Sequence, residues 1–290
     1  MPTVLVTGAG GQLGGELRQT APAGWRFAGY NRADLDVTRA DIVAAVLERE
    51  RPSLVVHSAA YTAVDAAESE PDRAAEVNAR GAANVAEAAC RLGARLIHLS
   101  TDFVFDGAQG FPYLPSDPTN PLGVYGRTKL AGEREVERVS AGRALILRTA
   151  WVYSTRGHNF VRTMLRLMGE RESVGVVSDQ IGTPTWARGL AEAIWAAAVR
   201  PQIGGLHHWT DAGVASWYDV AIAIQEEALA LGLLPRAVPV HPLRTVDVPT
   251  PAPRPRYSVL DKTATWAALD VQPRHWRVNL RAMLRGLAHA

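Results

Sequence analysis

The glycine-rich stretch near the amino terminus constrains the fold of this chain more than any other feature. A short apolar run rich in β-branched residues, beginning at Thr3, breaks into a glycine cluster and continues as a helix-compatible segment from Gln12. Such a strand, turn and helix suit a dinucleotide pyrophosphate. Gly8 permits the tight turn, Gly11 lets the backbone approach the phosphates, and Gly14 allows close helix packing. The stretch predicts a cofactor-binding turn, and a plain structural turn is the alternative.

Composition excludes several other classes of protein. The 290 residues carry a net charge of +2 without a dense basic run, so no nucleic-acid partner is expected. The single Cys90 excludes an internal disulfide framework and a metal site made of several cysteines. No apolar run reaches transmembrane length, and the chain opens on a strand without a leader, which predicts a cytoplasmic protein with no membrane partner.

The first half of the chain alternates predicted strands and helices. Strands are expected at 3–7, 25–29, 54–57, 95–100 and 144–148, and helices at 12–18, 38–51, 71–93 and 125–139. This alternation predicts an α/β, Rossmann-like doubly wound parallel sheet. Right-handed crossovers would place the carboxyl ends of the strands along one rim. We assign residues 1–150 to an NAD(P)-binding domain.

The regular alternation of predicted strands and helices ends after residue 150. Helices are expected at 159–171, 185–199 and 216–231, with short strands at 174–177 and 205–209. This pattern predicts a smaller α+β lobe that is interleaved with the first domain. Residues 151–290 are therefore assigned mainly to substrate binding, with room for later segments to return to the first domain. The proline-rich stretch 241–256 is expected to be an ordered loop, because core-like tryptophans and leucines follow it.

Two further segments bear on the cofactor. The second predicted strand leads into Arg32, and an arginine at this point suits the 2′-phosphate of NADP. NAD remains the alternative cofactor, because Asp34 and Asp36 lie close by and an acidic residue here binds the ribose hydroxyls of NAD. The third strand is followed by the small residues Ala59 and Ala60, which leave room for a flat ligand. A simple strand-to-helix loop is the alternative reading of that segment.

Tyr125 and Lys129 carry the predicted chemistry. Four residues apart on a helix, they share a face and can point into one site. A free phenol has a pKa of about 10, and a nearby cation is expected to lower it toward the working range. A hydroxyl from Thr101 or Ser100, at the end of a neighbouring strand, could bond the substrate oxygen. Together these groups predict a site that moves a proton while a nicotinamide transfers hydride.

At this point the chain resembles the extended short-chain dehydrogenase/reductase superfamily and, within it, the dTDP-4-dehydrorhamnose reductase family. The resemblance covers essentially the full length and is most specific at Ser100–Phe105, Tyr125–Glu133 and Arg148–Tyr153. It implies reduction of the C4 keto group of dTDP-4-dehydro-β-L-rhamnose to dTDP-β-L-rhamnose. The implied cofactor is NADPH, with NADH as the alternative.

The resemblance also implies residue roles. Tyr125 would be the proton donor, Lys129 would hold the nicotinamide ribose, and Thr101 would assist at the keto oxygen. Gly8, Gly14 and Arg32 are predicted from the residues themselves to bind the cofactor. For this cofactor-binding set the resemblance implies Gly11, Gln12, Leu13, Asp36, Val37, Ala59, Ala60, Tyr61, Tyr125 and Lys129. The implied substrate-binding residues are Thr101, Asp102, Tyr125, Trp151 and Arg254.

The sequence departs from the family in two places. Pro253 stands where relatives more often have an arginine, which puts part of the expected sugar-diphosphate contact in doubt. Some relatives form magnesium-bridged dimers through glutamates. Glu16 and Glu192 match two of these, but no third matches near the carboxyl terminus. We therefore expect no metal, and a monomer or homodimer.

Two alternatives stay open at the level of the sequence. The first is a 4-ketoreductase for another deoxysugar nucleotide, with the same fold and the same proton relay but a different sugar pocket. The second is a non-catalytic regulatory subunit of the kind that partners methionine adenosyltransferase. The retained Thr101, Tyr125 and Lys129 favour an enzyme over that second alternative.

Overall fold

A six-stranded parallel sheet forms the centre of the protein. The computed structural model describes residues 1–272 and 274–288. The strands are β1 (Thr3–Thr7), β2 (Arg26–Tyr30), β3 (Leu54–His57), β4 (Arg95–Thr101), β5 (Leu145–Thr149) and β10 (Gly205–His208). Their order is β10-β5-β4-β3-β1-β2, and every neighbouring pair is parallel. The predicted Rossmann-like doubly wound sheet is therefore confirmed. The chain reverses its direction of travel across the sheet between β1 and β3, where such folds form a ligand crevice.

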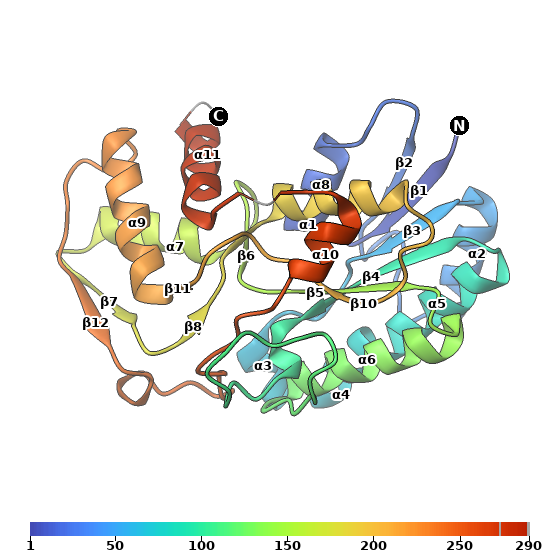
Figure 1. The fold of residues 1–290 in the computed structure, drawn as a ribbon, viewed down its shortest axis with the longest axis horizontal. Coiled ribbons are helices and arrows are strands. Elements are labelled where there is room, and N and C mark those ends of the chain that lie inside the picture. Colours follow the sequence, from blue (N-terminus) through green and yellow to red (C-terminus); the bar gives the residue numbers. More distant parts are fainter. Residues whose placement is uncertain (273, 289–290) are drawn as a thin grey trace.

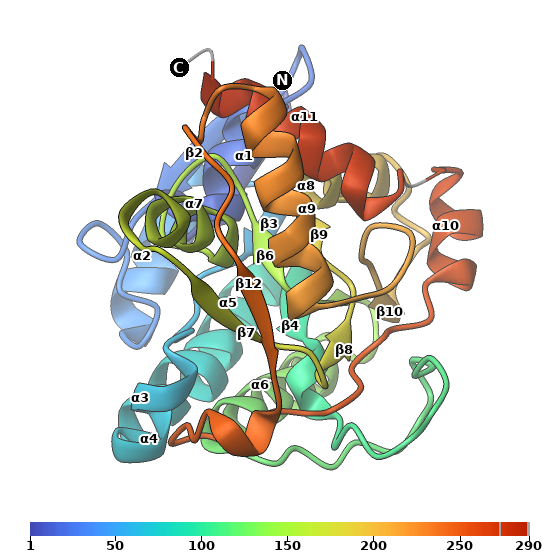
Figure 2. The same ribbon diagram turned by 90° about the vertical axis from the view of Figure 1, so that its left-hand side faces the viewer.

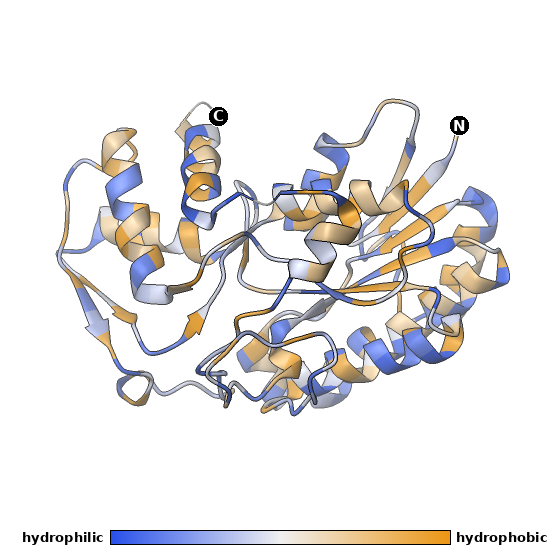
Figure 3. Cartoon of the chain, in the orientation of Figure 1, coloured by the Kyte–Doolittle hydropathy of each residue, from blue (hydrophilic) through white to orange (hydrophobic). Residues whose placement is uncertain are grey.

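Helices cover both faces of this sheet (Figure 1). One face is packed by α1 (Gln12–Gln19) and α8 (Ala187–Ala198), and the other by α2 (Ala40–Glu50), α5 (Gly81–Arg91) and α6 (Val124–Ser140). Because both faces are covered, strands such as β1 and β3 are buried along their whole length. Figure 3 shows the resulting pattern, with hydrophobic strands inside and hydrophilic outer helix faces.

The smaller lobe is built on three helices, α7 (Phe160–Glu170), α9 (Trp217–Ala230) and α11 (Trp276–Ala288). Its short strand pairs are β7 (Val174–Val177) with β12 (Val240–Leu243), β8 (Ile181–Gly182) with β11 (Ala215–Ser216), and β6 (Val152–Tyr153) with β9 (Thr185–Trp186). Its own apolar core includes Met164, Met168 and Leu280. Figure 2 views the molecule from the side of this lobe, with α7, α9 and β12 in front of the sheet.

The lobe and the sheet are interleaved along the chain. After α7 and β7 the chain returns to the sheet as α8 and β10, passes through α9 and β12 in the lobe, and comes back as α10 (Thr263–Leu269), which contacts α8 and β10. The segment 205–209, which sequence reasoning placed in the lobe, instead pairs with β5. Local sequence does not say which sheet a strand joins, because that choice depends on distant partners.

Two predicted helices differ from those observed. The Thr38-x-x-Asp41 pattern suggests a capping box, but α2 has Arg39 at its N-cap position, and the Thr38 hydroxyl donates to Asp36 instead. The helix expected over 71–93 consists of α4 (Pro71–Ala75), a π-helical turn (Glu76–Arg80) and α5. It follows α3 (Val64–Ser69). The π-turn matters below because it carries Asn78.

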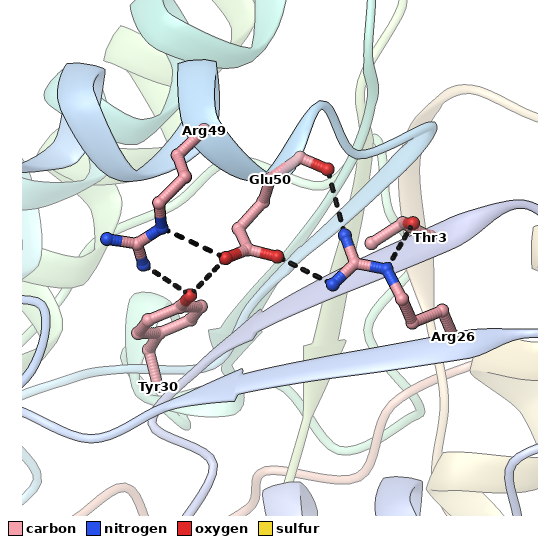
Figure 4. Close-up of polar contacts among 5 residues, drawn as sticks. All are labelled: Thr3, Arg26, Tyr30, Arg49 and Glu50. Atoms are coloured by element: carbon pink, nitrogen blue, oxygen red, sulfur yellow. Dashed lines mark hydrogen bonds and ion pairs between the residues drawn. The ribbon is translucent and has the colours of Figure 1, made fainter.

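The outer edge of the sheet is held by a polar network around Glu50, at the end of α2 (Figure 4). Its carboxylate accepts hydrogen bonds from Tyr30 and Arg26, each at 2.7 Å, and from Arg49 at 3.2 Å. These charge-assisted bonds, the one from Tyr30 first, lower the pKa of Glu50 to about 2. The network fastens α2 to β2, the edge strand of the sheet.

No helix within residues 1–272 and 274–288 is both long and apolar enough to span a membrane.

Candidate active site

A cavity of about 1210 Å³ lies along the carboxyl ends of the parallel strands and extends under the smaller lobe. Every residue that the sequence suggested as catalytic, cofactor-binding or substrate-binding lines it. These are Gly8, Gly11, Gln12, Leu13, Gly14, Arg32, Asp36, Val37, Ala59, Ala60, Tyr61, Thr101, Asp102, Tyr125, Lys129, Trp151 and Arg254. The fold thus brings together side chains spread over about 250 positions of the sequence.

The glycine turn has the shape that an anion site needs. Gly8 has a φ of 70°, and a Cβ there would lie 2.9 Å from the backbone nitrogen of Ala59. A Cβ on Gly14 would lie 2.5 Å from the Cα of Ala9, so only glycine lets α1 sit this close to the turn. Gly11 is the N-cap of α1, and no side chain caps the helix. The first N–H groups of α1 are therefore available to a phosphate.

Helix α6 brings Tyr125 and Lys129 to the cavity. Its N-cap residue is Gly123, which has no side chain to accept a bond from the first turn. The carboxylate of Glu68, from α3, takes that role and accepts a 2.7 Å hydrogen bond from the Val124 nitrogen. This contact fixes the start of the helix one residue before Tyr125.

The Tyr125 phenol is protonated at neutral pH. Burial raises its pKa to about 12, while a hydrogen bond with Thr101 acts in the opposite direction and the charge of Asp102 adds to the increase. The sequence-based expectation that Lys129 lowers this pKa is therefore wrong for the free protein. Desolvation outweighs the opposing hydrogen bond with Thr101, because a buried phenolate loses its hydration.

Lys129 is anchored rather than free. Its side chain is buried, and its Nζ donates a 2.7 Å hydrogen bond to the carbonyl oxygen of Leu99 in β4. Burial lowers the pKa of Lys129 to about 8, and the charge of Glu133 offsets part of that decrease. The ammonium is thus the main form at neutral pH but is lost in mildly alkaline solution.

A pair of buried histidines lies close to Lys129. The rings of His57 and His98, on adjacent strands, stack with centroids 5.2 Å apart, and the Nδ1 of His57 lies 2.8 Å from the Thr7 hydroxyl. Burial first, and then the charge of Lys129, lower the pKa of His57 to about 3 and that of His98 well below its usual range. Both imidazole rings are therefore neutral at neutral pH, so neither histidine adds a positive charge next to Lys129.

Thr101 and Asp102 form the floor next to Tyr125. The Thr101 hydroxyl donates to Asp102 Oδ1 at 3.1 Å and accepts from the Phe103 nitrogen at 3.2 Å. Burial raises the pKa of Asp102 to about 6, whereas hydrogen bonds from Ser258 and Thr101 oppose the increase. The second carboxylate oxygen of Asp102 has no protein partner. It is a buried acceptor that lacks a partner in the free protein.

An aromatic stack forms the wall of the cavity on the lobe side. The rings of Trp151 and Trp217 are parallel within 6° with centroids 3.6 Å apart, and Phe160 lies 4.5 Å from the Trp217 ring. Trp151 has a φ of 48°, a strained backbone for a bulky residue. The stack and the strand pairing of the next residue hold it there.

Two arginines complete the charged lining. Arg254 makes a double ion pair with Asp65, with distances of 2.5 and 2.7 Å, and remains at the cavity although Pro253 precedes it. Arg32 lies at the opposite end of the lining, beside Asp36, where its charge helps to lower the pKa of that carboxyl after the Thr38 backbone bond. Both arginines thus belong to the lining of the site.

Several lining residues escaped sequence reasoning, including Phe160, Trp217 and Ser258. The family resemblance extends over the segments that contain them, but no pattern in the sequence singled out these three residues. Asn78 was also missed. Its amide accepts from the Tyr61 nitrogen at 2.8 Å and donates to the Thr128 hydroxyl at 3.1 Å, joining the 59–61 loop to α6. Asn78 lies in a stretch that the sequence predicts to be one continuous helix, so no local pattern indicated that its side chain makes these contacts.

The described residues, 1–272 and 274–288, contain no group of three His, Cys, Asp or Glu side chains that could hold a metal ion. Glu16 is buried at 3% exposure, and burial raises its pKa, with Arg188 and Arg156 acting in the opposite direction. The expectation of no metal stays a prediction.

Comparisons with known proteins extend over the whole chain. Residues 2–289 match the family described as RmlD substrate binding domain. The chain is 41% identical to the dTDP-4-dehydrorhamnose reductase of Escherichia coli K12, covering 98% of this chain and 97% of that one. It is 42% identical to the reductase of the same name from Streptomyces griseus, covering 96% and 92%.

Solved structures agree in fold. The dTDP-4-dehydrorhamnose reductase of Bacillus anthracis, solved in complex with NADP, superimposes with a TM-score of 0.93 at 35% identity, covering 99% of this chain and all of that one. A UDP-glucose 4-epimerase from Thermus thermophilus, solved with NAD, gives a TM-score of 0.84 at 22% identity, which shows a shared fold only.

Proposed function

The chain belongs to the RmlD substrate binding domain family, and from that premise we propose that it is an NADPH-dependent dTDP-4-dehydrorhamnose reductase. The reaction is reduction of the C4 keto group of dTDP-4-dehydro-β-L-rhamnose to dTDP-β-L-rhamnose. The observation that carries this proposal is one cavity containing an open glycine turn, a Tyr-x-x-x-Lys pair and the Thr101 hydroxyl.

The residues present fit a dinucleotide. The cradle at Gly8, Gly11 and Gly14 leaves helix N–H groups free for a diphosphate, and Arg32 offers a guanidinium for a 2′-phosphate. The relative from Bacillus anthracis was solved with NADP, which supports the same cofactor here. When bound, the reduced nicotinamide supplies hydride to the C4 carbon.

Tyr125 supplies the proton. As hydride reaches C4, the carbonyl oxygen gains negative charge and needs a donor. A phenol whose pKa is raised to about 12 by burial is protonated at neutral pH, which is the state that a donor requires. The alkoxide that forms is more basic still, so transfer of the proton from Tyr125 to O4 is favourable.

Lys129 and Thr101 stabilise the charge that develops. After the transfer Tyr125 is a phenolate, and the anchored Lys129 ammonium, four residues along the same helix, favours that anion. The Thr101 hydroxyl, now bonded to Asp102, can turn to donate to O4. The Lys129 ammonium is held in place before the reaction, so the Thr101 hydroxyl is the group that must reorient.

The sugar nucleotide is proposed to lie between the nicotinamide site and the lobe. Asp102 has a free carboxylate oxygen that can accept from a sugar hydroxyl, and the Trp151 stack offers an apolar wall. Arg254 supplies positive charge for the diphosphate while it remains paired with Asp65. Because the preceding residue is Pro253 and not a second arginine, the contact with the diphosphate is limited to a single arginine in this segment.

The test is consumption of NADPH with purified substrate. We expect loss of nicotinamide absorbance with dTDP-4-dehydrorhamnose and formation of dTDP-β-L-rhamnose, identified by chromatography against a standard. Turnover confined to another 4-keto-deoxysugar nucleotide would favour the second ketoreductase assignment. Absence of turnover with every such substrate, with NADPH binding retained, would favour the regulatory alternative.

The remaining partner assignments follow from this chemistry. We infer a cytoplasmic location, because NADPH is a reductant of that compartment. The monomer or homodimer expected from the sequence stays a prediction, and neither a nucleic-acid nor a membrane partner is proposed.

A further inference from the structure

The side chains of Asn159 and Gln12 join the smaller lobe to the glycine turn. Asn159 is the N-cap of α7, and its Oδ1 accepts a 3.1 Å hydrogen bond from the Arg162 nitrogen. The other end of the same amide, Nδ2, donates at 3.0 Å to the Oε1 of Gln12, the first residue of α1. Asn159 is 6% exposed, so this bond is shielded from water.

The same amide also shapes the segment 154–158. Its Nδ2 donates to the carbonyl oxygens of Ser154 at 2.9 Å and Arg156 at 3.3 Å. The Ser154 hydroxyl closes the loop by donating to the Arg156 carbonyl at 3.0 Å. Asn159 therefore determines both the conformation of the segment and its attachment to Gln12.

The segment lies over the place where a diphosphate would bind. Gly157 and His158 line the cavity together with Gly11 and Gln12. Gly157 has a φ of 69°, and a Cβ there would lie 3.3 Å from the Gln12 Cγ, so the loop and the turn are in direct contact. The next residue in the chain, Phe160, belongs to the aromatic stack on the substrate side.

We propose that Asn159 is a positioning residue for cofactor binding, because its amide fastens segment 154–158 over the glycine turn through Gln12. It does not touch the reacting atoms. The inference rests on the proposed function only in that the ligand of the turn is a dinucleotide. Loss of the amide leaves Gln12 with its longer 3.5 Å bond to the Val152 carbonyl oxygen, and this weaker link lowers the affinity for NADPH.

The test compares direct NADPH affinities, measured by nicotinamide fluorescence without substrate. Asn159→Ser keeps an N-cap acceptor but removes the long amide. We expect its Kd for NADPH to rise about five- to tenfold, the effect of one shielded hydrogen bond. Gln12→Ala, which leaves the α7 cap intact, should show a similar rise. The double variant should bind no more weakly than the weaker single variant, because both changes remove the same link.

Thr163→Val is the matched control. It deletes another first-turn bond of α7, from the Thr163 hydroxyl to the Asn159 carbonyl, without touching Gln12. Besides that bond it removes a long, exposed contact of 3.5 Å with the Nε2 of His158. Its Kd should match that of the unaltered protein. Wild-type-like affinity in Asn159→Ser, additive losses in the double variant, or an equal loss in Thr163→Val would each overturn the inference. Failure of the unaltered protein to bind NADPH would instead contradict the proposed function.

Discussion

The ammonium of Lys129 is hydrogen-bonded to the carbonyl oxygen of Leu99, 2.7 Å away, across the junction of α6 and β4. This bond ties the cation to the sheet and fixes it beside the end of the strand that carries Thr101. Because the anchor is a backbone atom, it does not depend on a second side chain. The position of the positive charge is therefore built into the packing of helix on sheet.

Replacement of Tyr125 by Phe should abolish most turnover. The ring keeps its edge-on contact with Phe103, but the proton donor is lost. Loss of a general acid costs about 10²- to 10⁴-fold in kcat, with NADPH affinity changed little. Tyr113→Phe removes a phenol hydroxyl bonded to Asp106 and should keep normal kcat. Steady-state kinetics decides this, and near-normal kcat in Tyr125→Phe would refute the donor role.

Activity should decline in mildly alkaline solution because of Lys129. Its pKa is lowered to about 8 by burial, so the free enzyme loses the ammonium above that pH. We expect kcat/KM to fall as pH rises through about 8. The unfolded chain keeps this proton up to its ordinary pKa of about 10.4, so the same group makes the free energy of unfolding rise between those two pH values.

Lys262 provides the control for that pH profile. Burial lowers its pKa to about 8 as well, but it does not line the cavity. Lys262→Met should keep the alkaline decline in kcat/KM, measured between pH 6 and 10, whereas Lys129→Met should show a low, flat profile. A profile of the unaltered enzyme that is level to pH 9.5 would contradict the assignment.

Arg32 is expected to set the preference for NADPH over NADH. A guanidinium hydrogen-bonded to a 2′-phosphate contributes roughly 1.5–3 kcal/mol, or at least tenfold in affinity. Arg32→Ala should therefore raise KM for NADPH about tenfold or more and leave KM for NADH nearly unchanged. Arg39→Ala removes an exposed arginine that is paired with Asp41 and does not line the cavity, and it should change neither KM. Equal effects on both cofactors would argue against a phosphate contact.

The buried ion pair between Arg148 and Glu133 should be essential for stability. The two side chains are 3% and 6% exposed and share two hydrogen bonds, at 2.9 and 2.7 Å. Glu133→Gln leaves a buried guanidinium without its counter-charge, which should cost about 3–5 kcal/mol in the free energy of unfolding. The exposed pair Arg138–Glu135 is the comparison, and Glu135→Gln should cost less than about 1 kcal/mol. Urea denaturation measures both, and equal losses would contradict the prediction.

Gly132 should tolerate no side chain. A Cβ on it would lie 2.2 Å from the carbonyl oxygen of Asn78, so α6 and the π-turn would have to separate. Gly132→Ala should cost about 1–3 kcal/mol in the free energy of unfolding. Gly169, in α7, has open space around it, so Gly169→Ala should stabilise by up to about 1 kcal/mol. Denaturation curves in which the two changes have the same sign would refute this packing argument.

The sequence by itself determined the elements whose chemistry is local. Three features depend only on short stretches of the sequence: the glycine turn, the Tyr125–Lys129 spacing, and the alternation of strands and helices. Each of them directly constrains the direction of the backbone or of a side chain. Because parallel strands share one rim for their carboxyl ends, the candidate residues that follow them could be gathered into one site before any coordinates.

Only the tertiary structure decided the properties that depend on distant partners. Burial, not the neighbouring cation, sets the pKa of Tyr125, and the desolvation of a ring cannot be read from its flanking residues. The stacking of Trp217 on Trp151 and the bond from Asn159 to Gln12 join segments 66 and 147 positions apart. The physical reason is that these contacts exist only after the lobe has packed against the sheet, so no local pattern encodes them.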